Sequence, residues 1–365
     1  MSRPPADGTG TRPRDPRRPP ARRPARLRTA GRALRLLGVY VARFEAPVLR
    51  AALRGRASDT HECERLVARL SHRFFTEGLR GAGLALDTAD GLPLPASDRP
   101  VLLLLRHSGP LNFQLGALLA CHVLDRGMLG VGRALPGLDP AVGLLARRLR
   151  VDLIRWRAGG PARAMRLLMR HARDLAPCDA LAYFPEGANM TAAGRRRALA
   201  ELAAKDPGRA RWADGLRYVL PPVSAGAARV LSLARDADVL VVGHTGLEDL
   251  VGALVDIGYP PVDSRRIHLT WWHTRAEDVP REPAAAAAWL DGQWEAMDRW
   301  IAGKRGTPDP DPRPDAPPPP DASRRPTDSP PPPPPPSPDA SPPPGSTAGG
   351  PYTRHPIPVG EPGHD

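Results

Sequence analysis

Short apolar runs alternate with longer amphipathic stretches along the central part of the chain. The short runs are almost continuously apolar and are bounded by turn-forming residues, which is typical of strands buried on both faces. We expect strands at 101–105, 128–132, 151–154, 180–184, 218–223, 239–244 and 267–272. Helical spacing predicts helices at 115–124, 141–149, 163–175, 195–205, 226–237 and 284–301. This alternation predicts an α/β fold with a largely parallel sheet flanked by helices.

Two further helical stretches precede the first of these strands, at 34–53 and 60–81. The first is amphipathic, and charged residues such as Arg35, Arg43 and Arg50 interrupt it, so no stretch reaches the ~18 apolar residues of a transmembrane helix. Two interpretations of 34–53 remain open. It is either a helix lying on an anionic membrane surface, or an ordinary helix packed against the domain.

The two ends of the chain differ in composition from its middle. Residues 1–35 contain eleven Arg and two Asp, which together supply +9 of the net charge of +13, and residues 307–365 contain 24 of the 48 Pro. Segments so poor in apolar residues cannot bury enough surface to offset the entropy of ordering. We therefore expect a disordered arm at 1–33, a helical segment at 34–98, an α/β domain at 99–302 and a disordered tail at 303–365.

Charge and cysteine content argue against some kinds of partner and site. All but two of the 52 cations are arginine, which together with abundant Ala, Gly and Pro indicates GC-rich coding, and the basic arm lacks the interleaved aromatic residues of a nucleic-acid binder. Cys63, Cys121 and Cys178 are widely spaced and form no C-x-x-C pair. We therefore expect no nucleic-acid partner, no metal site and a reducing, cytoplasmic setting.

Two polar turns follow predicted strands and carry candidate chemistry. RHSGPLN (106–112) follows the strand at 101–105, and PEGANMT (185–191) follows the strand at 180–184. Functional groups of parallel sheets gather at the carboxyl ends of strands. The ordinary pKa of a histidine side chain suits proton removal near neutral pH, so His107 is a candidate base. Glu186 is a candidate carboxylate in the second turn. The alternatives are a strand-end histidine and a glutamate that caps the next helix.

Taken together, these two turns resemble the motifs of the glycerolipid acyltransferase family, which includes the 1-acylglycerol-3-phosphate acyltransferases. The first motif of that family is a histidine followed five residues later by aspartate; here it is His107 with Asn112 in the place of the aspartate. The second is Phe-Pro-Glu-Gly, here 184–187. Weaker blocks at 130–143 and 218–223 also fit, so the resemblance covers roughly 100–245.

The resemblance implies an acyltransferase-like fold and a reaction. His107 would take a proton from the hydroxyl of a lysophospholipid acceptor, which then attacks an acyl thioester of CoA or acyl carrier protein, and Asn112 would orient His107. No bound cofactor is implied. The protein would serve phospholipid biosynthesis on the inner face of the cell membrane. The remaining residues implied to bind substrate are Glu186, Gly187, Arg133, Arg155 and Asn189.

Two departures from the family pattern bear on activity. Asn112 carries no charge, and in serine proteases an Asp-to-Asn change at the orienting position lowers kcat about 10⁴-fold. A catalytically weak lipid-binding pseudoenzyme of the same fold is therefore the alternative. Asn189 stands where many members have an arginine that contributes to phosphate binding, and Arg195–Arg197 are candidates to replace it. His244, after another strand, is a further candidate for the same cleft.

Overall fold

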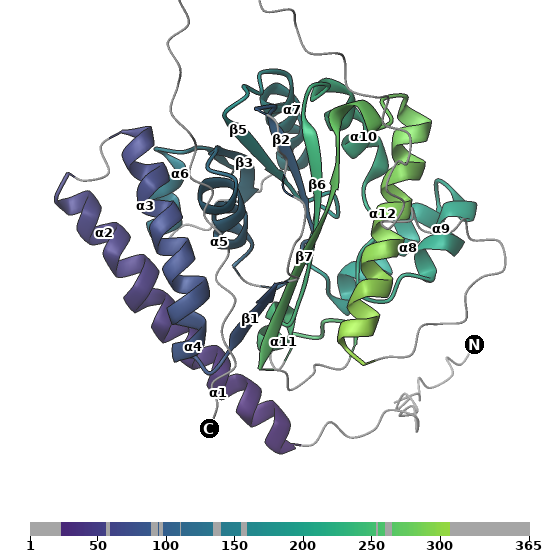
Figure 1. Cartoon of the computed structure of the whole chain (residues 1–365). Helices are drawn as coiled ribbons and strands as arrows, with labels where there is room; N and C mark the ends of the chain where they lie inside the picture. Colours follow the sequence, from purple (N-terminus) through teal and green to yellow (C-terminus); the bar gives the residue numbers. More distant parts are fainter. Residues whose placement is uncertain are drawn as a thin grey trace, which may run out of the picture.

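A seven-stranded sheet forms the centre of the computed structural model (Figure 1). The structure describes residues 23–55, 59–88, 94, 98–109, 111–133, 140–154, 159–252, 255–259 and 265–306. Residues 1–22 of the arm expected at 1–33, and residues 307–365 of the tail expected at 303–365, therefore lie outside the described residues. The strands are β1 (Ala85–Thr88), β2 (Val101–Leu105), β3 (Gly127–Arg133), β4 (Arg150–Ile154), β5 (Asp179–Tyr183), β6 (Asp238–Thr245) and β7 (Arg266–Thr274).

The strand order is β1-β7-β6-β2-β5-β3-β4. Every neighbouring pair is parallel except β6 and β7, which are antiparallel. The expectation of a largely parallel sheet is therefore confirmed. The central strand β2 lies between β6 and β5, so the chain segments that follow these three strands leave the sheet at the same edge.

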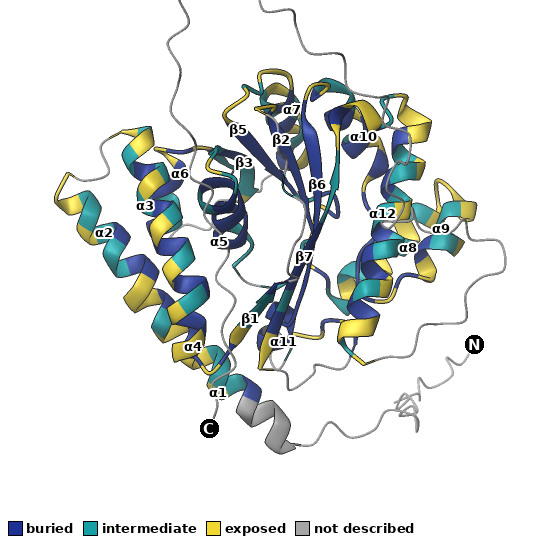
Figure 2. Ribbon diagram, in the orientation of Figure 1, coloured by how far each residue is buried: buried dark blue, intermediate teal, exposed yellow. Residues whose placement is uncertain are grey.

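The apolar side chains of the central strands alternate between two cores. On β2, Leu103 and Leu105 belong to one core, whereas Leu102 and Leu104 belong to the other. All five residues of β2 are buried, as Figure 2 shows for the central strands. Burial on both faces explains why the strands are continuously apolar rather than alternating.

Helices cover both faces of the sheet (Figure 1). On one face lie α1 (Arg23–Tyr40), α2 (Ala46–Leu53), α3 (Thr60–Arg73), α4 (Leu79–Gly81), α5 (Asn112–Ala117) and α6 (Pro140–Ala146). On the other lie α7 (Gly160–Arg173), α8 (Ala192–Ala203), α9 (Pro207–Asp214), α10 (Ser224–Leu233) and α12 (Pro283–Lys304). The short α11 (Leu247–Val251) follows β6. Single π-helical turns join α1 to α2 (Val41–Glu45), join α3 to α4 (Phe74–Gly78) and extend α5 (Leu118–Val123).

The N-terminal helices share the core of one sheet face. Leu36, Tyr40 and Phe44 recur at four-residue spacing, are buried, and belong to the same core as the β2 side chains Leu103 and Leu105. The Nε2 of Gln114 in α5 also donates to the Tyr40 hydroxyl at 2.6 Å. α1 begins at Arg23, so ordered helix extends into the range 1–33 for which composition predicts disorder.

Two elements differ from the expected ones. Residues 218–223 form bends and extended loop rather than a strand, because the N–H groups of Tyr218 and Val219 donate to the Asp298 carboxylate, and Pro221 and Pro222 have no N–H for a ladder. The edge strand β1 was not expected, since its four residues, Ala-Leu-Asp-Thr, have no strand-like pattern.

None of the described helices is both long enough and apolar enough to cross a membrane.

Candidate active site

The two turns singled out in the sequence meet at the carboxyl edge of the sheet. β2 and β5 are neighbours, with Leu104 paired to Tyr183, so His107 and the Phe184–Gly187 turn leave the sheet side by side. The Phe184 ring meets the His107 ring edge-on with centroids 4.9 Å apart. The N–H of Met190 donates to the main-chain oxygen of His107 at 3.1 Å. Residues about 80 apart in sequence therefore form one site.

The His107 ring is half-buried and neutral at physiological pH. Burial lowers its pKa to about 4, while hydrogen bonding to the Asn189 side chain acts in the opposite direction. Its Nδ1 is buried, and no hydrogen-bond partner for it is found among the described residues. A neutral imidazole is the form that accepts a proton, and the lowered pKa at the same time makes it a weaker base than an ordinary histidine.

Asn112 contacts Asn189 rather than the histidine ring. Its Nδ2 donates to Oδ1 of Asn189 at 3.3 Å, and within the described part of the chain no hydrogen bond joins Asn112 to His107. Asn112 is the first residue of α5 and follows Leu111, which has a left-handed backbone (φ 73°) that is unfavourable for leucine. The strained turn places the start of α5 at the edge of the site.

Glu186 lies beneath its turn instead of facing an open cleft. Only 5% of its surface is exposed, and Nε1 of Trp294 donates to its Oε1 at 3.2 Å. Burial raises the pKa of Glu186 to about 7, against the opposing effects of the Arg106 charge and of the N–H groups of His107 and Leu220. Glu186 is thus held under the turn by Trp294, and its buried Oε2 has no hydrogen-bond partner among the described residues.

Gly187 forms the exposed tip of this turn. Its N–H donates to the oxygen of Phe184 at 3.0 Å, and its φ is +66°. A Cβ at this position would meet nothing closer than Val223 Cγ2 at 3.8 Å. Glycine is therefore favoured here by the backbone angle and not by lack of space.

The candidate basic residues have different surroundings. Arg133 is the exposed last residue of β3, beside β5, and no ion pair is found for it among the described residues. Arg155 lies outside the described residues. Arg195 donates to the main-chain oxygens of Asp214 and Leu216, so it holds a neighbouring loop and is not free to replace a phosphate-binding arginine. Arg196 and Arg197 are exposed.

A buried charge network centred on Arg106 lies under the site and was not expected from the sequence. The guanidinium of Arg106 is fully buried. Its Nη1 donates to the main-chain oxygen of His244 and to Oε1 of Glu248, the latter at 3.0 Å. Its Nη2 donates to the oxygen of Tyr218 and to the hydroxyl of Tyr259, both at 2.7 Å. One side chain thereby joins the ends of β2 and β6 to two loops.

Glu248 and Asp249 complete the charge balance of this network. Burial alone would raise the pKa of Glu248, but the charge of Arg106 and further neighbours lower it to about 2, so this carboxylate is ionised. Arg305, just after α12, pairs with Asp249 through two bonds of 3.0 Å and reaches Glu248 at 3.4 Å. We call Arg106, His244, Glu248, Asp249, Tyr259 and Arg305 the Arg106 network.

His244 belongs to this network and is not exposed to a cleft. It is fully buried, and its Nε2 lies 3.2 Å from the main-chain oxygen of Arg106, to which it donates. Burial, reinforced by the Arg106 charge, lowers its pKa to about 4. A buried neutral histidine bound to a strand end has a structural role.

Helix α12 supports the site through one face. Trp294 and Asp298 are four residues apart and therefore lie on the same side of the helix. Trp294 binds Glu186, and Asp298 accepts from the N–H groups of residues 217–219, the segment beside Arg106. An acidic residue on the buried face of a helix is the signal that could have pointed to this role.

No cluster of three or more His, Cys, Asp or Glu side chains suited to a metal ion occurs among the described residues. The polar groups of the site that could act on a substrate are a neutral base, two side-chain amides and the N–H groups of the turn at Gly187. Such a set can move a proton and hold a polar or anionic acceptor.

Comparison with known proteins shows a likeness to solved structures. No family model matches the chain, and no curated protein matches it. Among solved structures, the chain is similar to the 1-acyl-sn-glycerophosphate (LPA) acyltransferase PlsC from Thermotoga maritima. The two are 14% identical with a TM-score of 0.47, over 77% of this chain and 98% of that chain. At this level the likeness says nothing about activity, which has to be judged from the side chains of the site.

Proposed function

We propose that the chain is an O-acyltransferase that moves an acyl group from a thioester to the hydroxyl of a lysophospholipid. One observation carries this proposal: His107 and the Phe-Pro-Glu-Gly turn, the two motifs of the family that the sequence resembles, contact each other at the carboxyl edge of the sheet. The neutral state of the His107 ring suits the general base that such a reaction needs.

The proposed reaction needs no covalent enzyme intermediate. The neutral ring of His107 accepts the proton of the acceptor hydroxyl as its oxygen bonds to the thioester carbonyl carbon. The tetrahedral intermediate then collapses with cleavage of the carbon–sulfur bond, and the departing thiolate takes the proton back from the imidazolium. The products are an ester and the free thiol of CoA or acyl carrier protein, and the ring returns to its starting state.

The acceptor class is proposed from the groups around the base. Arg133 at the end of β3 is exposed beside the strand that carries the turn, and we assign it to the acceptor phosphate together with the N–H groups of Ala188 and Asn189, since the N–H of Gly187 already donates to Phe184. Arg155 is proposed as a second phosphate ligand, and this assignment rests on the resemblance to the glycerolipid acyltransferase family. Glu186, being buried and bonded to Trp294, is assigned to the support of the turn rather than to the acceptor.

Turnover can be measured as release of free thiol. Purified protein is given acyl-CoA or acyl-acyl carrier protein with lysophosphatidic acid or other lysophospholipids, and diacyl product is followed in parallel. We expect His107→Ala to lower kcat by at least about 100-fold, the lower range for loss of a general base. Thiol release that is the same in wild type and His107→Ala would contradict the proposal.

The second candidate is a lipid-binding pseudoenzyme. It is favoured by Asn112, which is uncharged and has a buried Oδ1 for which no partner is found among the described residues. Saturable binding of lysophospholipid without thiol release from any donor would support this candidate over the enzyme.

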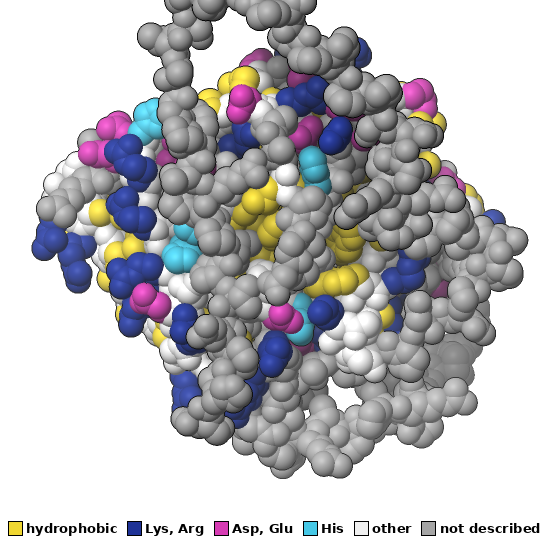
Figure 3. Space-filling view, in the orientation of Figure 1, with side chains coloured by type: hydrophobic (Ala, Val, Ile, Leu, Met, Phe, Trp, Pro, Cys, Tyr) yellow, Lys and Arg dark blue, Asp and Glu magenta, His cyan; other side chains and the backbone are white. Residues whose placement is uncertain are grey.

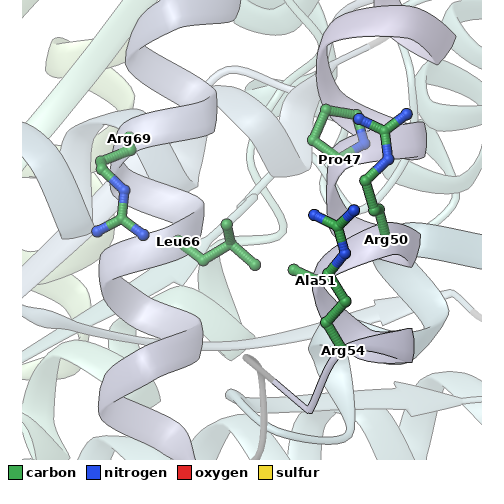
Figure 4. Close-up of a pocket in the computed structure, with 6 residues that line it drawn as sticks. All are labelled: Pro47, Arg50, Ala51, Arg54, Leu66 and Arg69. Atoms are coloured by element: carbon green, nitrogen blue, oxygen red, sulfur yellow. The ribbon is translucent and has the colours of Figure 1, made fainter.

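We also propose that α1–α3 rest on an anionic membrane surface. Leu34, Leu37 and Val41 of the α1 region have 70%, 58% and 49% of their surfaces exposed, at spacings that place them on one face. Arginines gather over α2 and α3 (Figure 3). Between these two helices a shallow hollow is lined by Arg50, Arg54 and Arg69 around Leu66, which points from α3 toward α2 (Figure 4). Exposed apolar groups beside arginines suit a bilayer with anionic headgroups.

Vesicle sedimentation tests this orientation. The triple change Leu34→Ser, Leu37→Ser and Val41→Ser should weaken binding to vesicles containing phosphatidylglycerol by about tenfold or more, since it removes the groups available for insertion. Arg196→Ala with Arg197→Ala, which removes two exposed cations from α8, is the matched control and should bind like wild type. Equal binding of the triple variant and wild type would exclude this face of α1.

A further inference from the structure

The two asparagines of the chain contact each other beside His107. In 365 residues, asparagine occurs at positions 112 and 189 and nowhere else. Although 77 residues separate them, the Nδ2 of Asn112 donates to Oδ1 of Asn189 at 3.3 Å. A residue type that the rest of the chain avoids is therefore used twice, and both times at this site. We call Asn112 and Asn189 the amide pair.

The backbone holds both members of the pair in place. Asn189 lies between Gly187, whose φ of +66° sets the turn, and Met190, whose N–H donates to the main-chain oxygen of His107 at 3.1 Å. Thr191 then caps α8 by accepting from the N–H of Gly194 at 2.9 Å. Asn112 is presented by the left-handed turn at Leu111. The segment around Asn189 is thus tied directly to the residue whose ring it adjoins.

The charged groups near His107 face its main chain and not its ring. Glu186 approaches the N–H of His107, and the guanidinium of Arg106 and the ring of His244 lie in the network beneath. Among the described residues no carboxylate forms a hydrogen bond or ion pair with the His107 ring. The Asn189 side chain, which Asn112 contacts at 3.3 Å, lies close enough to the ring to favour its protonated form.

We propose that Asn189 is the positioning residue of His107: its side-chain oxygen accepts from a ring N–H, and the Asn112 amide, donating to the same oxygen, fixes that acceptor. A carbonyl oxygen has two lone pairs and can accept from both donors at once. Asn112 therefore acts through Asn189, and Asn189 is a positioning residue rather than the substrate-binding residue expected from the sequence. The role of the ring as a base rests on the proposed function.

An uncharged positioning residue has a defined chemical consequence. An amide oxygen selects one tautomer of the imidazole, as a carboxylate does, but it stabilises the imidazolium less. The ring keeps its lowered pKa and stays available as a base well below neutral pH. A carboxylate in contact with the ring would raise the pKa by a unit or more.

The ionisation and tautomer of His107 give a test that does not depend on turnover. In nitrogen-15 NMR spectra, with the His107 signals assigned by their loss in His107→Ala, the wild-type ring should show one tautomer and Asn189→Ala a mixture of both. Asn189→Asp should raise the ring pKa by about one to two units. Thr191→Ala, which removes the α8 cap but neither amide, is the control and should leave tautomer and pKa as in wild type. An unchanged ring in both Asn189 variants would overturn the proposal, whether or not the protein turns over.

Steady-state kinetics then separate positioning from substrate binding. Asn189→Ala should lower kcat about 10- to 100-fold with the KM of the lysophospholipid changed less than about threefold, because the base and not the acceptor is misplaced. A raised KM with unchanged kcat would instead show that Asn189 binds substrate and does not position His107. If wild type itself fails to turn over, the proposed function fails while the NMR test still decides the positioning.

Two Asn112 variants test whether Asn112 affects the His107 ring through Asn189. If Asn112 acts through Asn189, the double variant Asn112→Ala with Asn189→Ala should be no slower than Asn189→Ala alone. Asn112→Asp replaces the donor by a carboxylate oxygen facing Oδ1 of Asn189 and should lower kcat. Additive losses in the double variant, or a gain in kcat from Asn112→Asp, would overturn the proposal.

Discussion

Arg106 and His107 are consecutive residues that belong to two very different surroundings. The Arg106 side chain enters a buried network in which each charge has an opposite charge or a hydrogen-bond partner, including Glu248 at 3.0 Å. The His107 side chain enters a half-open turn whose polar neighbours, the amide pair, are uncharged. Formal charge is thus placed under the site, where it is compensated, and is kept away from the ring that is proposed to react.

The comparison teaches which interactions hold the edge of the sheet and which act on a substrate. Breaking a buried, paired charge leaves the partner uncompensated and affects folding, whereas removing an exposed amide affects only its neighbours. The two regions should therefore respond to substitution in opposite ways, the Arg106 network in stability and the amide pair in chemistry.

The largest effect is expected from Arg106→Met. Loss of the guanidinium leaves Glu248 buried beside fewer donors and should lower the free energy of unfolding by about 3–5 kcal/mol. Arg196→Met, at an exposed position of α8, is the control and should stay within about 0.5 kcal/mol. Urea denaturation measures both variants. Equal stability of the two would show that the network does not hold the sheet edge.

Acidification should destabilise the protein through His244, and His107, whose pKa is lowered to about the same value, adds to the effect. Its folded pKa of about 4 lies below the ordinary value of 6.5, so the unfolded chain binds the extra proton and stability falls as pH drops from 6.5 toward 4. This group should account for roughly 3 kcal/mol of the loss. Glu186, with a pKa raised to about 7, contributes the opposite slope between its ordinary value and pH 7, since there the folded state binds the extra proton.

The acid loss is assigned to His244 by comparing variants rather than from wild type alone. Denaturation curves recorded from pH 7 to pH 4 should be flatter for His244→Asn than for wild type. His61→Asn changes an exposed histidine of α3 and should follow wild type. Parallel pH dependence of wild type and His244→Asn would contradict the assignment.

Gly109→Ala tests the junction between the two regions. Gly109 has φ +83°, and a Cβ there would lie 2.8 Å from the main-chain nitrogen of Glu248. The substitution should cost about 1–3 kcal/mol from the backbone angle and the clash. Gly143→Ala in α6, where a Cβ would meet nothing within 4 Å, should be neutral or slightly stabilising. Thermal unfolding of the two variants gives the comparison.

The smallest effect on stability is expected from Asn189→Ala. Asn189 is exposed, so its loss should change the free energy of unfolding by less than about 0.5 kcal/mol. Thr191→Ala, two residues later, removes a helix cap and should cost about 1 kcal/mol. A destabilisation by Asn189→Ala larger than that of Thr191→Ala would mean that the amide pair holds the fold and is not reserved for the ring.

The parts of the molecule that could be predicted are those with local signals. Apolar runs such as 101–105 and 239–244 locate buried strands, and the turns that carry His107 and Glu186 follow directly from strand ends. The prolines at 221 and 222 are the local signal against a strand at 218–223, because they have no N–H for a ladder. β1 could not be predicted, because its pairing with β7 depends on residues about 180 positions away.

The Arg106 network and the amide pair could not be predicted, because neither leaves a local pattern. From the sequence alone, an arginine after a strand is interpreted as an ordinary surface residue. Its buried partner, the carboxylate of Glu248, lies 142 residues later in the chain. The contact of Asn112 with Asn189 likewise depends on β2 and β5 being neighbours. Strand order, which the sequence pattern leaves open, decides which side chains meet.

The clamped main chain of His107 has a consequence for the entropy of the site. Its carbonyl oxygen accepts from the N–H of Met190 at 3.1 Å, so the peptide group that follows the residue is fixed. Only the rotation of the side chain remains to be restricted, and ordering one side chain costs of order 1 kcal/mol. A single amide hydrogen bond is of comparable size. A neutral partner is therefore strong enough to hold a ring whose backbone has already been immobilised.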